Sequence, residues 1–123
     1  MANELALNAS LTYTKNSVVI NEAINALLVT VTGNGLNSLN SFSATTAAIA
    51  IPLGSSTSAG GWIFVMNLDP TNYVNLLTGT SGTIFGRLLP GEFALFRFDA
   101  SVTAPAVQAH TSACQIKFCL FDT

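Results

Sequence analysis

The sequence has little charge of either sign. Four Lys and Arg and six Asp and Glu make up only 8% of its 123 residues, about a third of the share found in an average soluble domain. Four basic side chains are too few for the phosphate neutralisation on which nucleic-acid binding depends. They are also too few for a polybasic, membrane-surface protein. We therefore expect neither a nucleic-acid partner nor a membrane partner.

Long apolar runs are missing as well, and cysteine is rare. No stretch reaches the roughly 20 residues of a transmembrane helix, and because residues 1–4 lack the charged and apolar regions of a signal peptide we expect none. Cys114 and Cys119 lie five positions apart, so on one strand they would face opposite sides, roughly 16 Å apart. That distance is too long for a disulfide. Two free thiols without a signal peptide predict a protein made in a reducing cytoplasm.

Groups that carry chemistry are scarce. The single histidine, His110, has no second histidine or Cys-x-x-Cys pair to complete a metal site. The six carboxylates are scattered, so a glycosidase pair such as Glu92 with Asp69 would have to be assembled by the fold. A Gly-x-Ser-x-Gly nucleophile elbow is absent. We expect a protein that is not an enzyme and that has no catalytic, cofactor-binding or metal-binding residues.

Period-two hydrophobicity dominates the sequence instead, between runs of Thr, Ser and Asn. It predicts strands over residues 5–13, 27–31, 47–53, 62–68, 73–77, 84–89, 93–98 and 113–121, with loops over 34–43 and 54–61. Only residues 18–28 compete for helix; their β-branched flanks and two asparagines argue against it, and a single helical turn stays open. About eight short strands predict an all-β, antiparallel β-sandwich of jelly-roll type, as one domain over residues 1–123.

Aromatic side chains crowd the last strands. Alternation places Phe96 and Phe98 on one face and Phe93 on the other, and Phe118 opposite Phe121. One face is core, and an apolar second face has to meet another chain, because a small monomer rarely leaves a large apolar patch exposed. Low charge and strand edges with few lysines support the same conclusion. We expect a homo-oligomer, with a trimer preferred.

Two turn motifs stand out by their chemistry. In the first, Asn and Asp side chains can cap a turn, proline fixes φ, and a second Asn tolerates a left-handed backbone. We expect this motif to join the strands on either side of it as a hairpin. In the second, Pro-Gly suits the centre of a type II turn, and Glu92 follows, placed to pair with Arg87 or Arg97. We interpret the motifs as a structural turn signature and not as an active site; its residues are Asn67, Asp69, Pro70, Asn72, Pro90 and Gly91.

The same two motifs carry a resemblance. Residues 61–74 read GWIFVMNLDPTNYV, and residues 88–97 read LLPGEFALFR. This resembles small bacteriophage virion proteins in which an NLD-x-TNYV hairpin precedes an L-x-PGE-x-A turn and strand. Residues 109–118, of the form A-x-TSAC-x-I-x-F, are similar to the closing strand of those proteins. The resemblance covers residues 61–121, about half of the chain.

The resemblance implies a β-sandwich component of a phage particle, located in the virion. Our leading expectation is a capsid decoration or cement protein that contacts itself and the major capsid protein or other virion proteins. The alternative is a carbohydrate- or receptor-binding module of a tail or fibre. An exposed Trp62 or Tyr73 flanked by asparagine would favour the alternative, whereas burial of these rings would favour the capsid role.

Overall fold

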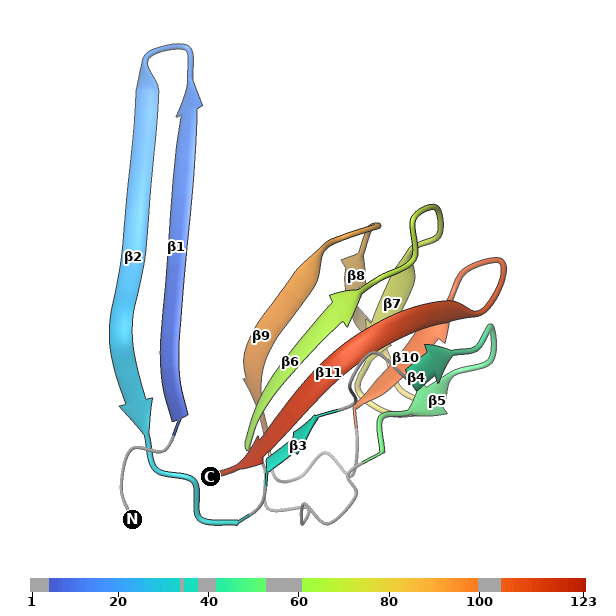
Figure 1. Cartoon of the computed structure of the whole chain (residues 1–123). Helices are drawn as coiled ribbons and strands as arrows, with labels where there is room; N and C mark the ends of the chain where they lie inside the picture. Colours follow the sequence, from blue (N-terminus) through green and yellow to red (C-terminus); the bar gives the residue numbers. More distant parts are fainter. Residues whose placement is uncertain (1–4, 34, 38–41, 53–60, 100–104) are drawn as a thin grey trace. The chain divides into compact units, whose positions relative to one another are not determined.

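The computed structural model describes residues 5–33, 35–37, 42–52, 61–99 and 105–123 (Figure 1). Within these ranges the chain is all-β and every strand pairing is antiparallel, which confirms the predicted fold class. We expected one sandwich domain over residues 1–123; contacts instead divide the chain into two compact units, Met1–Thr32 and Gly33–Thr123. The strands are β1 Leu5–Lys15, β2 Val18–Val29, β3 Gly35–Asn37, β4 Phe42–Ala44, β5 Ile49–Ala50, β6 Gly61–Asn67, β7 Val74–Leu77, β8 Ile84–Leu88, β9 Phe93–Phe98, β10 Ala106–Ala109 and β11 Cys114–Asp122.

The first unit is a long β-hairpin, formed by β1 and β2 (Figure 1). Asn16 and Ser17 both have positive φ, as the two-residue type I′ hairpin turn requires. Near the other end Asn25 and Ala26 together oppose Asn8, which makes a β-bulge. Ala26 has a φ of 54° there and donates its N–H to the Asn8 side chain at 2.8 Å. Residues 18–28, for which a helical turn stayed open, therefore lie within a strand.

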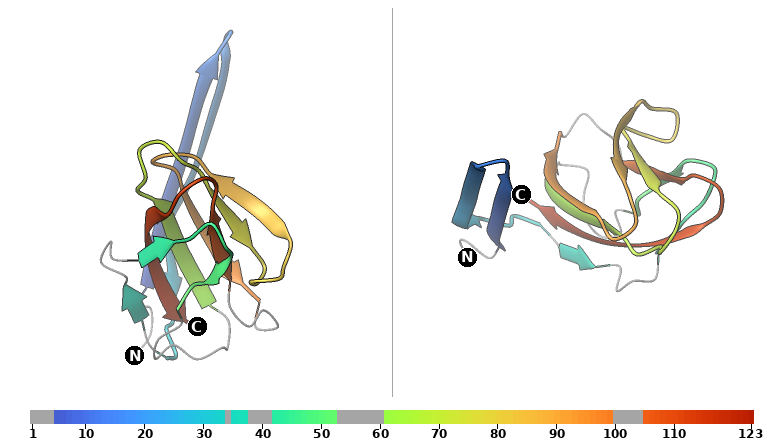
Figure 2. Two further views of the ribbon diagram at one scale, coloured as in Figure 1. Left: turned by 90° about the vertical axis from the view of Figure 1, so that its right-hand side faces the viewer. Right: turned by 90° about the horizontal axis from the view of Figure 1, so that it is seen from above.

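The second unit is a sandwich of two sheets. One has the strand order β5-β10-β7-β8; the other has β3-β11-β6-β9, with β4 also paired to β11. In Figure 1, β9, β6 and β11 run side by side as one layer, and Figure 2 gives two further views of both layers. The pairings are nested along the chain: β7 pairs with β8, β6 with β9, β5 with β10 and β4 with β11.

The core fills the space between the two sheets. Alternation in β6 buries Ile63 and Val65, and alternation in β11 buries Ile116, Phe118 and Leu120. The facing sheet contributes side chains from three of its strands to the same cluster; they are Val74, Leu76, Leu88, Val107 and Ala109. Burial of this apolar surface is the main driving force that holds the two layers together.

Several local expectations differ from the structure. The predicted loop 34–43 contains β3 and the start of β4, and the predicted strand 47–53 is reduced to the two residues of β5 among those described. Strand β10 has no counterpart among the predictions, because Ala-Val-Gln-Ala is too short a pattern to be told from loop. Its pairing with β5 and β7 creates the strand. The expected loop 54–61 lies outside the described residues, except for Gly61, which begins β6.

Candidate functional site

Asn67, the first residue of the turn signature, is completely buried at the end of β6. Its side-chain amide donates to the carbonyls of Asn72 at 2.8 Å and Leu88 at 3.1 Å, and its Oδ1 accepts from the backbone N–H of Asp69 at 2.9 Å. Its backbone bonds to both Glu92 and Gly91. Asn67 therefore fastens two separate turns to the end of one strand.

Asp69 and Pro70 shape the first of these turns. The Asp69 carboxylate accepts from the backbone N–H groups of Asn72 at 2.7 Å and Thr71 at 2.8 Å. These donors, Asn72 first and Thr71 second, lower the pKa of Asp69 below its ordinary value of 3.8. Asn72 in turn donates to the hydroxyl of Ser112 at 3.1 Å, which ties this turn to the one before β11.

The second turn, at Pro90 and Gly91, has the predicted type II features. Gly91 has a φ of +81°, and the N–H of Glu92 donates to the carbonyl of Leu89 at 3.0 Å, closing the turn. Glu92 was expected to pair with Arg87 or Arg97, and the contact that the structure gives for its carboxylate lies instead within the turn. Its carboxylate accepts from the N–H of Leu89 at 2.8 Å, because this orphan donor lies within the same turn.

The signature residues thus form one structural cluster, but the expectation of a hairpin is wrong. The strands before and after residues 68–73 are β6 and β7, which belong to different sheets, and the Pro90-Gly91 turn likewise joins β8 to β9 across the sandwich. Both turns are corners between layers. The register explains this, since β6 pairs with β11 and β9, and β7 pairs with β10 and β8.

Tyr73 lies half-buried just after the first corner, in a three-layer stack. The His110 ring stacks on it with centroids 4.2 Å apart, and the Arg87 guanidinium carbon lies 4.0 Å from the same centroid. Two groups this close to one ring centroid cannot share a face, so both faces of Tyr73 are occupied. His110, considered above for metal binding, and Tyr73, considered for sugar binding, are therefore packed against each other.

The most distinctive surface of the sandwich is the outer side of its larger sheet. Alternate residues of β6, β9 and β11 face away from the core there, and cross-strand register makes them neighbours. We call this surface the outer face; its described residues on these three strands are Trp62, Phe64, Met66, Phe93, Leu95, Arg97, Gln115, Lys117, Cys119 and Phe121. Seven of the ten are apolar and none is fully buried. Phe93 is 63% exposed, and its ring lies 5.8 Å from that of Phe64.

The other sheet presents a polar row instead. Gln108, Asn75 and Arg87 lie opposite one another on three neighbouring strands, and the Arg87 Nε donates to the Asn75 side chain at 3.2 Å. The contrast shows that an apolar exterior is not general to this sandwich. The other sheet also has exposed apolar side chains, Ile84 and Phe85 of β8, but on the outer face apolar residues continue across three neighbouring strands, as expected of a contact surface.

The two cysteines are free and differ in their surroundings, as their spacing predicts. Cys114 is buried and Cys119 is half-buried on the outer face. Burial raises the pKa of both thiols, helped at Cys114 by the Asp69 carboxylate and opposed at Cys119 by Lys117. Among the described residues no three His, Cys, Asp or Glu side chains are grouped so that they could hold a metal ion. The described residues also include no helix long and apolar enough to cross a membrane.

Comparisons with protein-family models, with curated proteins and with solved structures found no match. We therefore assign the candidate site to the outer face from its residues and their exposure alone. Sequence reasoning anticipated its apolar character from Phe93 and Phe121 but missed its two charges, Arg97 and Lys117. The signal for them is the same period-two alternation, continued along β9 and β11.

Proposed function

We propose that this chain is a non-enzymatic structural protein of a bacteriophage particle, a capsid decoration or cement protein that works as a homo-oligomer. Its partners are copies of itself, with a trimer preferred, and the major capsid protein or other virion proteins. The observation that carries the proposal is the outer face, with Phe93, Phe64 and Trp62 gathered on one side of the sandwich. A surface of this kind supports a role in protein contact.

The fold gives a second line of support. The nested strand pairing, from β7·β8 at the centre to β4·β11 at the outside, is the order of a jelly roll, and we propose that topology for the sandwich. Jelly rolls recur in viral capsid domains and in lectins. This is an analogy at the level of fold, which by itself does not identify a function.

In this role the protein would act by burying area across junctions between capsid subunits. Aromatic and Met side chains are enriched at the centres of protein interfaces, and Arg is enriched with them. The outer face has this composition, with apolar residues in its middle and Arg97 and Lys117 among them. Each copy bound across a junction opposes the separation of the two subunits beneath it.

The test uses the full chain and capsids purified from the phage that encodes it. We expect the wild type to show a concentration-independent, oligomeric molar mass by light scattering and to sediment with the capsids. Phe93→Asp should abolish capsid sedimentation, and Ile84→Asp, which places the same charge at an exposed position of β8, should not. Binding should also slow the alkylation of Cys119, which lies on the same face. A stable monomer that ignores the capsids would refute the proposal.

A second candidate, a carbohydrate- or receptor-binding module of a tail or fibre, is favoured by one observation. Trp62 is only half-buried and has Arg97 beside it on the outer face, an arrangement on which a sugar ring could stack. Tyr73 does not support this reading, because both of its faces are occupied. A glycan array that gives a hit abolished by Trp62→Ala, in a protein that does not bind capsids, would replace the first proposal with this one.

A further inference from the structure

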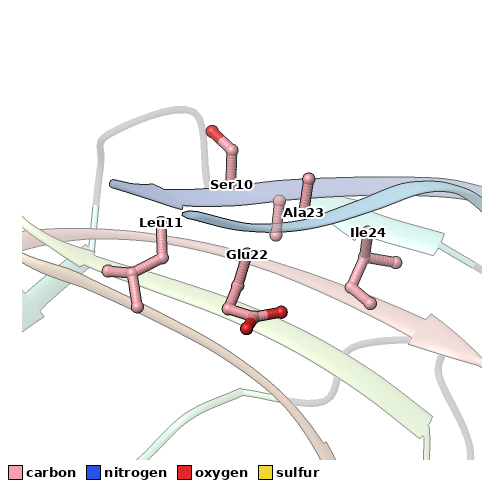
Figure 3. A pocket seen from close by; sticks show the side chains of 6 residues that line it. Ser10, Leu11, Glu22, Ala23 and Ile24 are labelled. Carbon is pink, nitrogen blue, oxygen red and sulfur yellow. The ribbon is translucent and has the colours of Figure 1, made fainter. Parts of the chain in front are cut away.

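The β1–β2 hairpin has two chemically different faces. The register places Leu11 opposite Glu22 and Tyr13 opposite Ile20, and alternation puts both pairs on the same side. Figure 3 shows Leu11, Glu22 and Ile24 projecting to one side of the ribbon and Ser10 to the other. We call the first side the apolar hairpin face; its residues are Leu5, Leu7, Ala9, Leu11, Tyr13, Lys15, Val18, Ile20, Glu22, Ile24, Leu27 and Val29. The opposite side is mixed, with five polar residues, Asn8, Ser10, Thr12, Thr14 and Asn21, and four apolar ones, Ala6, Val19, Ala23 and Leu28.

The outer half of the apolar hairpin face, toward the turn, is uncovered. Leu11 is 60% exposed and Ile24 is 56% exposed, and Tyr13 is also exposed. A pocket opens at this level of the hairpin, lined by residues that include Leu11 and Ile24 (Figure 3). A two-stranded hairpin is at best marginally stable in water by itself, and the alternation of apolar and polar residues over residues 7–14 is useful only where one face is buried. The hairpin by itself therefore supplies no surface that covers this face.

Two opposite charges lie within the uncovered half. Glu22 stands opposite Leu11, and Lys15 stands opposite Val18 at the turn. Their levels are four residues apart along β1, which is about 13 Å. Tyr13 and Ile20 form the pair midway between them.

These charges distinguish the ways in which two identical faces can pack. If hairpins associate in parallel, about a two-fold or three-fold axis along the strands, each Glu22 meets another Glu22 in an apolar setting, which is unfavourable. If they pack antiparallel about a two-fold axis at the level of Tyr13 and Ile20, each Glu22 meets the partner's Lys15. Like an aligned β-sandwich, the second arrangement buries both apolar faces.

We propose that the apolar hairpin face packs antiparallel against the same face of a second copy, with Glu22 paired to the partner's Lys15. The inference deepens the proposed function and rests on it only in that copies of the chain assemble. It assigns the hairpin to self-association and leaves the outer face of the sandwich for the virion partner. Because the contact is two-fold, it joins two copies of any closed ring that the sandwiches form and so doubles the number of chains in the assembly.

Charge reversal in the full-length protein tests the pairing. We expect Glu22→Lys alone and Lys15→Glu alone each to weaken the hairpin contact by at least about tenfold, because like charges then meet. Each should halve the molar mass measured by sedimentation at a fixed concentration. The double variant Glu22→Lys/Lys15→Glu restores the pairs and should restore the mass. Asn21→Lys and Thr14→Glu, the matched controls on the opposite side, should leave it unchanged.

Each other outcome counts against the inference. A double variant as weak as the single variants, or single variants that keep the full mass, would overturn the antiparallel pairing. A mass that rises with Glu22→Leu would show that the hairpins meet in parallel. Rescue by the double variant in a protein that does not bind capsids would refute the proposed function but not the hairpin pairing. Single variants that keep the full mass and still bind capsids would refute the hairpin pairing but not the proposed function.

Discussion

The side-chain amide of Asn67 donates to the carbonyl of Leu88, 21 residues further along the chain, at 3.1 Å. The two residues end strands of opposite sheets, β6 and β8. Because the bond is buried, water cannot replace it at low cost. It joins the two layers at their corners, where the apolar core ends.

We expect Asn67→Ala to destabilise the sandwich by about 2–4 kcal/mol. The substitution leaves the Leu88 carbonyl without the bond from Asn67 and removes the acceptor of the Asp69 N–H. Urea unfolding followed by Trp62 fluorescence measures the change. Thr80→Ala, which removes an exposed polar group from the β7–β8 turn, is the control and should change stability by less than about 0.5 kcal/mol. Equal effects of the two substitutions would show that Asn67 does not tie the corners together.

Substitutions at two glycines distinguish the cost of backbone strain from the cost of steric clash. A Cβ added at Gly91 or at Gly79 would meet no atom within 4 Å, but only Gly91 has a positive φ, +81°. We expect Gly91→Ala to cost about 1–2 kcal/mol and Gly79→Ala to cost much less. Thermal unfolding of both variants measures the difference. If Gly91→Ala were as stable as Gly79→Ala, the type II turn would not depend on glycine.

Asp69 makes stability depend on pH in a defined direction. Its pKa is lower in the folded protein than its ordinary value of 3.8, so the folded state binds fewer protons than the unfolded state. The stabilisation is fully present above about pH 4 and is lost as the pH falls through the lower, folded pKa. We expect the melting temperature of the wild type to fall more between pH 5 and pH 2 than that of Asp69→Asn. Parallel curves for the two proteins would contradict this.

Ala26 offers a stabilising substitution in the hairpin. Its φ of 54° lies in the left-handed region, which is unfavourable for alanine by about 1 kcal/mol and accessible to glycine. We expect Ala26→Gly to slow hydrogen exchange of amides in β1 and β2 by a few-fold. Ala23→Gly in the regular part of β2 has the opposite expectation, faster exchange, because glycine weakens a strand interior. Faster exchange in Ala26→Gly would show that the bulge does not strain this residue.

Alternation allowed both faces of the central strands to be predicted from sequence. In β6 it separates Ile63 and Val65, which are buried, from Trp62 and Phe64 on the outer face. In β9 it separates Phe98 from Phe93 in the same way. The period works because the β6–β9 and β6–β11 ladders run without a register shift, so that each side chain keeps its face along the strand.

The corners could not be predicted in the same way. Asn67, Asp69 and Pro70 specify a tight turn, and the same chemistry serves a hairpin and a connection between sheets. The choice depends on distant partners, since β11 takes the place beside β6 that β7 would fill in a hairpin. The β1–β2 hairpin was likewise predicted only in part. Residues 5–13 were predicted as a half-buried strand, whereas most of its partner, β2, consists of residue types that also suit a helix.

The nested pairing sets the order in which strand partners become available while the chain is being synthesised. β7 and β8 meet across a short turn, closed by the bond from the Thr78 N–H to the Thr83 carbonyl at 3.1 Å, and each further pair encloses the one before it. β11 pairs with β3, β4 and β6, so the larger sheet lacks its central strand until residue 122 has left the ribosome. During synthesis the β6–β9 pair therefore keeps the edge of β6 that later binds β11 unpaired. Strand β6 therefore meets β11 only after all the other described strands have been made.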